Sequence, residues 1–335
     1  MGRLYLGKNA TLHVGNLCII AITGLSIILN IAIYPWMPSE TNVFSLFIET
    51  AEQQFSACLF SFFIIACIII NIRILQNTAS AKRILTDYFV HRLLVLLATF
   101  LCMFNFSVFK QTIPLIASFS WDPTLLEVDK ALFGGQLLTT WLNTYLPMGV
   151  LSHYADTCYA SWVTISGAIL LWRALSHDNT QRFHYFIAWL LCWILLGSIM
   201  ALLFSSVGPC FYAHFYTDVP STIYQSFPLN PQGTLLTDDA KTFLLSVSQQ
   251  HRYTVGFGIS AFPSLHVATS VINAQTLAAA HPLLGRLGWL YVGAVTISAT
   301  YLGFHYMIDC LAAIVAAYSI WLFTHYLLQH YVDSK

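Results

Sequence analysis

The sequence predicts an all-α protein, a polytopic membrane helical bundle of about eight spans. Of its 335 residues, 57% are hydrophobic and only 8% are charged, whereas soluble domains carry about 25% charged residues. The apolar runs are about 20 residues long, which suits a spanning helix and exceeds the strand length of a membrane barrel. The net charge of +0 provides no basic surface for nucleic acid, so no nucleic-acid partner is expected.

Eight apolar runs are candidate spans. They lie at residues 15–34, 54–72, 89–109, 153–175, 183–206, 262–280, 286–304 and 305–329. The last two are nearly continuous, so Gly303-Phe304-His305 is expected to form the turn between them, at the membrane surface. Residues 137–151 are short for a span and indicate an interfacial or re-entrant helix. The long connections at 35–53, 110–152 and 207–261 have the length of functional loops.

The distribution of basic residues predicts an orientation. Most of the 14 lysines and arginines fall on the side of the membrane that holds both termini. The positive-inside rule therefore places both termini in the cytoplasm and the three long connections on the extracytoplasmic side. That side is the periplasm for a bacterial inner membrane, or the lumen in a eukaryote. A crossing by residues 137–151 would change this topology.

The stretch from Gly256 to His266, GFGISAFPSLH, precedes a new apolar run. Gly256 and Gly258 allow the backbone to approach a ligand closely. Ser260 is expected to be the N-cap of the following helix, with Pro263 in its first turn. Because a glycine-preceded helix N-terminus attracts anions, this stretch predicts an anion site with His266 as a titratable group beside it.

A second polar stretch, YLGFHYMID from Tyr301 to Asp309, lies between two apolar runs. His305 and Asp309 are spaced i, i+4 and would share one face of a helix. An aspartate that accepts the Nδ1–H of an imidazole leaves Nε2 free as a nucleophile or base. A lone histidine at a helix end is more often structural, but two histidines on the same predicted side, beside an anion site, indicate catalysis.

Two cations are candidate ligands of the anion. Lys110 lies at the end of the third span, just before a helix end that Pro114 is expected to mark; alone, it is equally well a lysine that snorkels to the interface. Arg252 lies shortly before the glycine stretch, where a solvated loop charge is a slightly commoner role than that of a ligand.

Three further residues have structural interpretations. His153 and Asp156 begin the fourth span, together with Tyr159, on the side of the candidate site. The first two either line the site or form structural hydrogen bonds, and the structural role is the commoner one. Asp122 is expected to cap a helix. The eight cysteines show no CxxC spacing, so neither a disulfide framework nor a zinc site is expected.

The chain resembles the type 2 phosphatidic-acid phosphatase superfamily, and most of all its branch of inositol-phosphorylceramide synthases and their bacterial relatives. Five motifs carry the resemblance: Phe109-Lys110-xx-Ile113-Pro114, Trp121-Asp122-Pro123 followed by Asp129, Ser206-Val207-Gly208-Pro209-Cys210, GISAFPSLH at 258–266, and GFHYMID at 303–309. The resemblance implies a six-helix catalytic membrane domain at residues 86–335, preceded by a two-span addition at residues 1–85.

The resemblance also implies roles for the site residues. His305 would attack phosphorus and form a phosphohistidine, while Asp309 would hold and polarise its ring. His266 would protonate the leaving alkoxide as a general acid. Ser264 and neighbouring backbone N–H groups would bind phosphate oxygens, with Lys110 as the cation. The expected chemistry requires no metal and no cofactor.

Two phosphate-binding arginines of the phosphatases are missing. Their matching positions are occupied by Ala117 and Ser118, and by Ala299 after Ser298. A phosphomonoester carries close to two negative charges, which suit arginine forks, whereas a phosphodiester carries one. The departure favours a phosphodiester lipid as the first substrate. Arg252 could instead replace a missing arginine and preserve hydrolysis of a monoester.

The sequence therefore predicts an enzyme that transfers a phospho-headgroup from a phospholipid to a lipid alcohol, in the manner of a sphingolipid synthase. The alternative within the family is a lipid phosphate phosphatase, in which water is the acceptor. The alternative of another class is a non-catalytic lipid or anion transporter, because intramembrane ionisable residues also mark transport paths. Headgroup, lipid backbone and oligomeric state are left open.

Overall fold

The computed structural model describes residues 2–37, 48, 81–146, 148–227, 235–249 and 258–333. Within these ranges every regular element is a helix, which confirms the all-α class. The predicted span at residues 54–72 and the candidate ligand Arg252 lie outside the described residues.

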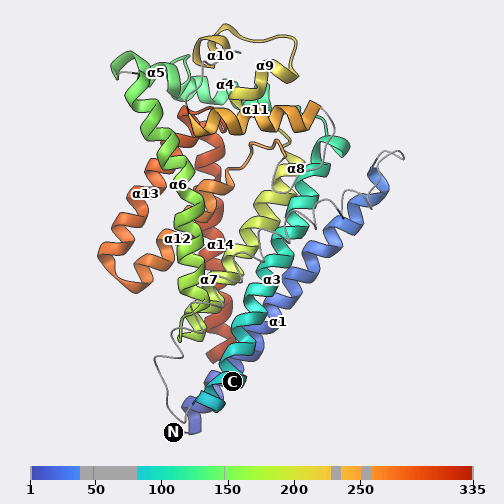
Figure 1. Ribbon diagram of the computed structural model, residues 1–335, viewed down its shortest axis with the longest axis vertical. Helices are drawn as coiled ribbons and strands as arrows, with labels where there is room; N and C mark the ends of the chain where they lie inside the picture. Colours follow the sequence, from blue (N-terminus) through green and yellow to red (C-terminus); the bar gives the residue numbers. More distant parts are fainter. Residues whose placement is uncertain are drawn as a thin grey trace.

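Long helices run along the length of the molecule (Figure 1). They are α1 (Gly2–Ile33), α3 (Ala81–Ile116), α6 (Met148–Ala174), α7 (Asn179–Leu191), α12 (Leu265–Ala280), α13 (Pro282–Tyr301) and α14 (Met307–Asp333). A π-helical segment, η2 (Cys192–Met200), and a last turn, α8 (Ala201–Leu203), extend α7.

Short helices cover one end of this bundle (Figure 1). They are α4 (Asp122–Leu132), α5 (Leu138–Tyr145), η3 (Pro209–Phe211), α9 (Tyr212–Phe215), α10 (Ser221–Ser226) and α11 (Leu236–Gln249). A further turn, η1 (Tyr34–Trp36), ends α1. The N-terminal end of α1 and the C-terminal end of α14 lie together at the opposite end of the bundle.

Five described helices are long and apolar enough to cross a membrane, so the chain is an integral membrane protein. They cover Val14–Trp36, Arg92–Ile116, Asn179–Leu203, Pro282–Tyr301 and Met307–His330. The predicted spans at 153–175 and 262–280 correspond to α6 and α12, which are not among the five. With 16 residues, α12 is shorter than the about 20 that a span needs, and α6 has the length but a polar first third.

Residues 137–151 do not form a span. Helix α5 has only eight residues, about 12 Å of helix, and α6 begins at Met148. This confirms the prediction that the stretch does not cross. Pro114 was expected to mark a helix end, but it lies inside α3, which continues to Ile116.

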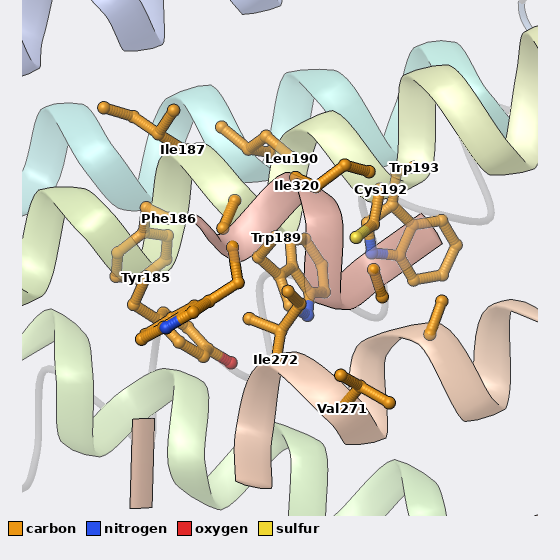
Figure 2. Close-up of a cluster of buried hydrophobic side chains, with 14 of the residues drawn as sticks. Tyr185, Phe186, Ile187, Trp189, Leu190, Cys192, Trp193, Val271, Ile272 and Ile320 are labelled. Atoms are coloured by element: carbon orange, nitrogen blue, oxygen red, sulfur yellow. The ribbon is translucent and has the colours of Figure 1, made fainter. Parts of the chain in front are cut away.

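The core lies where α7 packs against α12 and α14. Figure 2 shows side chains of α7 and η2, among them Tyr185 and Trp189, facing Val271 and Ile272 of α12 and Ile320 of α14. These side chains are less than a tenth exposed, and burying each large apolar side chain contributes about 1.5–3 kcal/mol.

Helix α12 meets α3 across the π-helical segment. A Cβ at Gly197 would lie 2.6 Å from Leu265 and 2.7 Å from Phe106. Only a glycine therefore lets the start of α12 and the middle of α3 approach η2 from two sides. This packing brings the first turn of α12 beside the end of α3.

Gly208 is essential to the loop between α8 and η3. Its φ is +88°, and an added Cβ would lie 2.5 Å from the carbonyl oxygen of Phe304. We expect Gly208→Ala to lower the free energy of unfolding by about 2–4 kcal/mol, from backbone strain and overpacking. Thermal unfolding in detergent, followed by circular dichroism, should show a clearly lower midpoint.

Gly24→Ala is the matched control. Gly24 lies within α1, and a Cβ added to it would have no other atom within 4 Å; alanine is favoured over glycine in a helix by up to about 1 kcal/mol. Its midpoint should be unchanged or slightly higher. Equal midpoints for the two variants would contradict the close approach of Gly208 to Phe304.

Candidate active site

The three motif segments from the loops meet at the covered end of the bundle. The carbonyl and hydroxyl oxygens of Ser206 accept the N–H groups of Ala261, at 2.9 Å, and Phe262, at 3.1 Å. The N–H of Cys210 donates to the carbonyl of Gly303 at 2.9 Å. Segments that are far apart in sequence are thereby joined into one backbone framework.

His305 lies in the turn between α13 and α14, held by the left-handed Gly303 with φ +81°. The expected turn is thus confirmed. His305 is not on a helix with Asp309, as the i, i+4 spacing suggested, because α14 begins only at Met307. The backbone N–H of His305 donates to Ala299 at 3.3 Å, and its side chain is buried.

The Nδ1 atom of His305 has a backbone partner. It lies 2.7 Å from the carbonyl oxygen of Ala261 and 3.7 Å from Oδ2 of Asp309. A carbonyl can only accept, so Nδ1 carries the proton and Nε2 is left with its lone pair. The direct acceptor is therefore Ala261, whereas Asp309 supplies a negative charge slightly further away.

Asp309 lies in the first turn of α14 and is fully buried. Its Oδ2 accepts the N–H of Tyr306 at 2.9 Å, which ties the carboxylate to the turn that carries His305. Its Oδ1 has no hydrogen-bond partner within the described part of the chain. Asp309 can therefore stabilise a positive charge on the neighbouring imidazole.

His266 lies in the first turn of α12, facing His305. The two ring centroids are 6.3 Å apart. The Nδ1 atom of His266 is 3.1 Å from the hydroxyl of Tyr159, and its ring stacks on that of Tyr159 at 4.4 Å. Trp162 also packs against it, with ring centroids 4.3 Å apart. Both aromatic residues come from α6.

Lys110 is half-buried near the end of α3. A Cβ at Gly258 would lie 3.0 Å from the Lys110 carbonyl and 3.1 Å from its Cγ, so the glycine lets the motif loop run against the lysine. The pKa of His266 lies well below its ordinary value, mainly because the ring is buried and in part because the basic side chains of His305 and Lys110 are near. The structure therefore brings Lys110, His266, His305 and Asp309 together.

Ser264 has a structural task. It is the N-cap of α12, and its hydroxyl accepts the N–H of Val267 at 3.5 Å. The prediction that Ser260 would be the N-cap, with Pro263 in the first turn, is wrong. Helix α12 begins at Leu265, two residues after Pro263. Ser264 is fully buried, and its N–H donates to the Asp309 carbonyl at 3.3 Å.

Two buried aspartates of α4 hold the framework of the site. Oδ2 and Oδ1 of Asp122 accept the N–H groups of Val207 and Gly208, both at 2.8 Å. The carboxylate also accepts the hydroxyls of Tyr216 and Tyr306. Asp122 was expected to cap a helix, but its carboxylate binds this loop instead. Burial raises its pKa above the ordinary value, opposed by these hydrogen bonds.

Asp129 caps α14 from another helix. Its carboxylate accepts the N–H groups of Met307 at 2.8 Å and Ile308 at 3.1 Å, which are two of the unpaired donors at the start of α14. Burial raises the pKa of Asp129 to about 7, against the opposing effect of the two N–H groups, and the nearby charge of Asp309 adds to the rise.

Asp156 performs the same task for α11. It accepts the N–H groups of Leu236 at 3.0 Å and Thr237 at 2.9 Å, which confirms its structural interpretation. His153 is exposed. Within the described ranges, no group of three His, Cys, Asp or Glu side chains could hold a metal ion, and the cysteines found there are free. The metal-free and cofactor-free chemistry remains a prediction.

Sequence reasoning missed the partners of the two histidines. The carbonyl of Ala261 carries no side-chain signal. Tyr159 was placed on the side of the candidate site but received no role, and Trp162 received no role in the site. Their positions on one face of α6, spaced i, i+3, are the signal that would have grouped them.

We expect Asp129→Ala to destabilise the protein and lower its activity. The change leaves two buried N–H groups at the start of α14 unpaired, at about 1–3 kcal/mol for each, and loosens the turn that holds His305. Thermal unfolding and a turnover assay with the lipid substrate would measure both effects.

Glu127→Ala is the control on the same helix. Its side chain is 69% exposed and pairs only with Lys130, so its loss should change stability by no more than about 1 kcal/mol. Wild-type stability and activity in Asp129→Ala would contradict the role assigned to this carboxylate.

Comparison with known proteins identifies the family. A family model described as the PAP2 superfamily, the type 2 phosphatidic-acid phosphatases, matches residues 123–323. The match includes both histidine motifs and begins after Lys110. No curated protein and no solved structure gives a significant match. The chain therefore belongs to the PAP2 superfamily, and this membership indicates a membrane lipid phosphatase or phosphotransferase.

Proposed function

We propose that the protein transfers a phospho-headgroup from a phosphodiester lipid to an alcohol acceptor through a phosphohistidine intermediate on His305, in the manner of an inositol-phosphorylceramide synthase. The observation that supports this most directly is the 2.7 Å contact between Nδ1 of His305 and the Ala261 carbonyl. It leaves the Nε2 lone pair available for attack on phosphorus.

In the first step, Nε2 of His305 forms a bond to phosphorus and the bond from phosphorus to the lipid oxygen breaks. His266 gives a proton to this leaving oxygen. With ring centroids 6.3 Å apart, the two histidines are close enough to contact the same phosphate group. Asp309, 3.7 Å from Nδ1, stabilises the positive charge that develops on the His305 ring.

In the second step, the acceptor hydroxyl gives its proton to His266 and its oxygen attacks phosphorus. The bond between phosphorus and Nε2 breaks, which restores both histidines. Lys110 balances the charge of the non-bridging oxygens in both steps. Backbone N–H groups of the motif loop assist it, while Ser264 contributes by capping α12.

The scarcity of cations supports a phosphodiester as substrate. Among the described residues, Lys110 is the lysine or arginine whose charge acts on His266. Lys241 of α11 lies 5.3 Å from the centre of the Phe304 ring, but its charge is paired with that of Asp238 at 3.6 Å. The position of one missing arginine is taken by Ala299, which is fully buried and binds the N–H of His305. One cation suits the single charge of a diester better than the double charge of a monoester.

An apolar cavity supports a lipid as substrate. It has a volume of about 210 Å³ and lies between α6, α12 and α13, lined by Ile165, Ile169, Leu277 and Leu287. It begins about one turn below His266 along α12. A cavity of this character suits an acyl chain whose phosphate reaches the histidines.

Two further parts of the proposal concern the orientation of the chain in the membrane and the bounds of its domains. Both termini face the cytoplasm and the site faces the extracytoplasmic side, as the basic residues indicate; the termini and the short helices lie at opposite ends of the bundle. Residues 86–335 form the catalytic domain, and residues 1–85 are an addition to it. The placement of both histidines at one end of the bundle favours an enzyme over a transporter, whose ionisable residues lie near the midplane.

The test uses purified protein in detergent, with phosphatidylinositol and phosphatidic acid as donors and ceramide or diacylglycerol as acceptor. Mass spectrometry follows free phosphate and new phospholipids. We expect a new headgroup-bearing lipid from phosphatidylinositol. His305→Ala should lower the rate by about 10³-fold or more, and His266→Ala by about 10²–10⁴-fold.

His214→Ala is the matched control, because His214 is exposed on α9 at the same end of the molecule. It should retain wild-type activity. Phosphate release from phosphatidic acid, without transfer, would replace the transferase with a lipid phosphatase. Activity that survives in His305→Ala would contradict the phosphohistidine, and no product with either donor would favour a transporter.

A further inference from the structure

Two aromatic residues of α6 hold the ring of His266. Tyr159 stacks on one face at 4.4 Å with an interplanar angle of 25°, and Trp162 packs at 4.3 Å with an angle of 52°. Trp162 is itself held, because its Nε1–H donates to the hydroxyl of Thr269 at 2.9 Å. The imidazole therefore has little freedom to rotate about its side-chain bonds.

The stack continues beyond Tyr159. Its other neighbour is Phe304, whose ring is 5.0 Å away and nearly parallel, with an interplanar angle of 3°. Phe304 immediately precedes His305 in the turn after α13. The ring of Tyr159 is thus held between one candidate catalytic histidine and the neighbour of the other, and the hydroxyl of Tyr159 reaches Nδ1 of His266 at 3.1 Å.

We propose that Tyr159 is the positioning residue of the general acid: its hydroxyl oxygen accepts the Nδ1–H of His266 and directs Nε2 to the leaving oxygen of the lipid. The inference rests on the proposed function, in which His266 begins the reaction as an imidazolium. With both ring nitrogens protonated, an oxygen beside Nδ1 acts as an acceptor.

The same hydrogen bond serves both steps. After Nε2 has given its proton to the leaving oxygen, Nδ1–H stays on the Tyr159 oxygen and Nε2 has a lone pair. The acceptor hydroxyl then gives its proton to Nε2, which restores the imidazolium. His266 completes the cycle without a change of tautomer, and every proton that leaves Nε2 is returned to it.

A phenol suits this task better than a carboxylate. A carboxylate beside an imidazolium favours its charged form and makes it a weaker acid. Burial lowers the pKa of His266 well below its ordinary value, and its basic neighbours His305 and Lys110 lower it further. A neutral phenol orients the ring without adding a negative charge, so His266 remains a strong proton donor.

The test compares leaving groups in the full-length protein. One substrate is whichever of phosphatidylinositol and phosphatidic acid the wild-type protein cleaves, since its alkoxide needs a proton to depart. The other is the 4-nitrophenyl ester of the same transferred group, whose nitrophenolate departs without one. Tyr159→Phe keeps the stacked ring and removes only the hydroxyl.

We expect Tyr159→Phe to slow cleavage of the lipid by about 10-fold or more, a part of the 10²–10⁴-fold that a general acid contributes. Cleavage of the nitrophenyl ester should stay within about twofold. His266→Ala should show the same selectivity with a larger loss. Tyr159→Phe added to His266→Ala should cause no further loss of rate on the lipid, because both changes remove the same function, protonation of the leaving oxygen.

Tyr154→Phe is the matched control. Tyr154 lies on the same helix, α6, but its side chain is 72% exposed, so the variant should lose no selectivity between the substrates. Equal loss on both substrates in Tyr159→Phe would show a structural role and overturn the inference, as would an unchanged rate on the lipid or a further loss in the double variant.

His305→Ala separates this inference from the function on which it rests. If it eliminates cleavage of both substrates, the phosphohistidine holds, and the Tyr159→Phe result judges the positioning role alone. If it spares the nitrophenyl ester, or if the wild-type protein cleaves neither lipid, the proposed function is wrong and the inference is overturned with it.

Discussion

The site depends on buried aspartates that bind the backbone N–H groups of a loop and of the start of a helix. His266 lies in the first turn of a helix, and His305 lies in the turn between two helices. At such positions the backbone has N–H donors without a partner within the helix. Asp129 pairs the first donors of α14, and Asp122 pairs those of the loop at Val207 and Gly208. A hydrogen bond to a charged group contributes about 1.5–3 kcal/mol, which burial of the carboxylate partly offsets.

This arrangement explains why α4 and α11 matter although they carry no candidate catalytic residue. Helix α4 contributes Asp122 and Asp129, and α11 is bound at its first turn by Asp156. Each of these two short helices is thus tied to a long helix or a motif loop by a carboxylate. A change in α4 would affect the position of His305, because Asp129 of α4 binds Met307, two residues further along the chain.

Much of the fold could be predicted because composition and long apolar runs suffice for a membrane helix. The turn at Gly303 was predicted for the same reason, since one interruption separated two runs. Local signals for helix ends were less reliable. Ser260 and Pro263 had the features of an N-cap and a first turn, but α12 begins at Leu265, because the preceding residues bind Ser206 instead.

The candidate site was predictable where chemistry resides in side chains and spacing. His266, His305, Asp309 and Lys110 were all identified from motifs, and the structure brings them together. The Ala261 carbonyl beside His305 could not be predicted, because every residue has a carbonyl. Tyr159 is 107 residues from His266 in sequence, so only the packing of α6 on α12 reveals that they meet.

The surroundings of His305 bear on the choice between transfer and hydrolysis. A phosphohistidine reacts with whichever hydroxyl reaches phosphorus, and water is always present at a membrane surface. His305 is only 5% exposed, with the Phe304 ring on the neighbouring residue stacked on Tyr159. An acceptor that arrives from the bilayer with its own apolar chain has better access to such a position than bulk water. The low exposure of His305 is therefore a further argument for the proposed transfer between lipids.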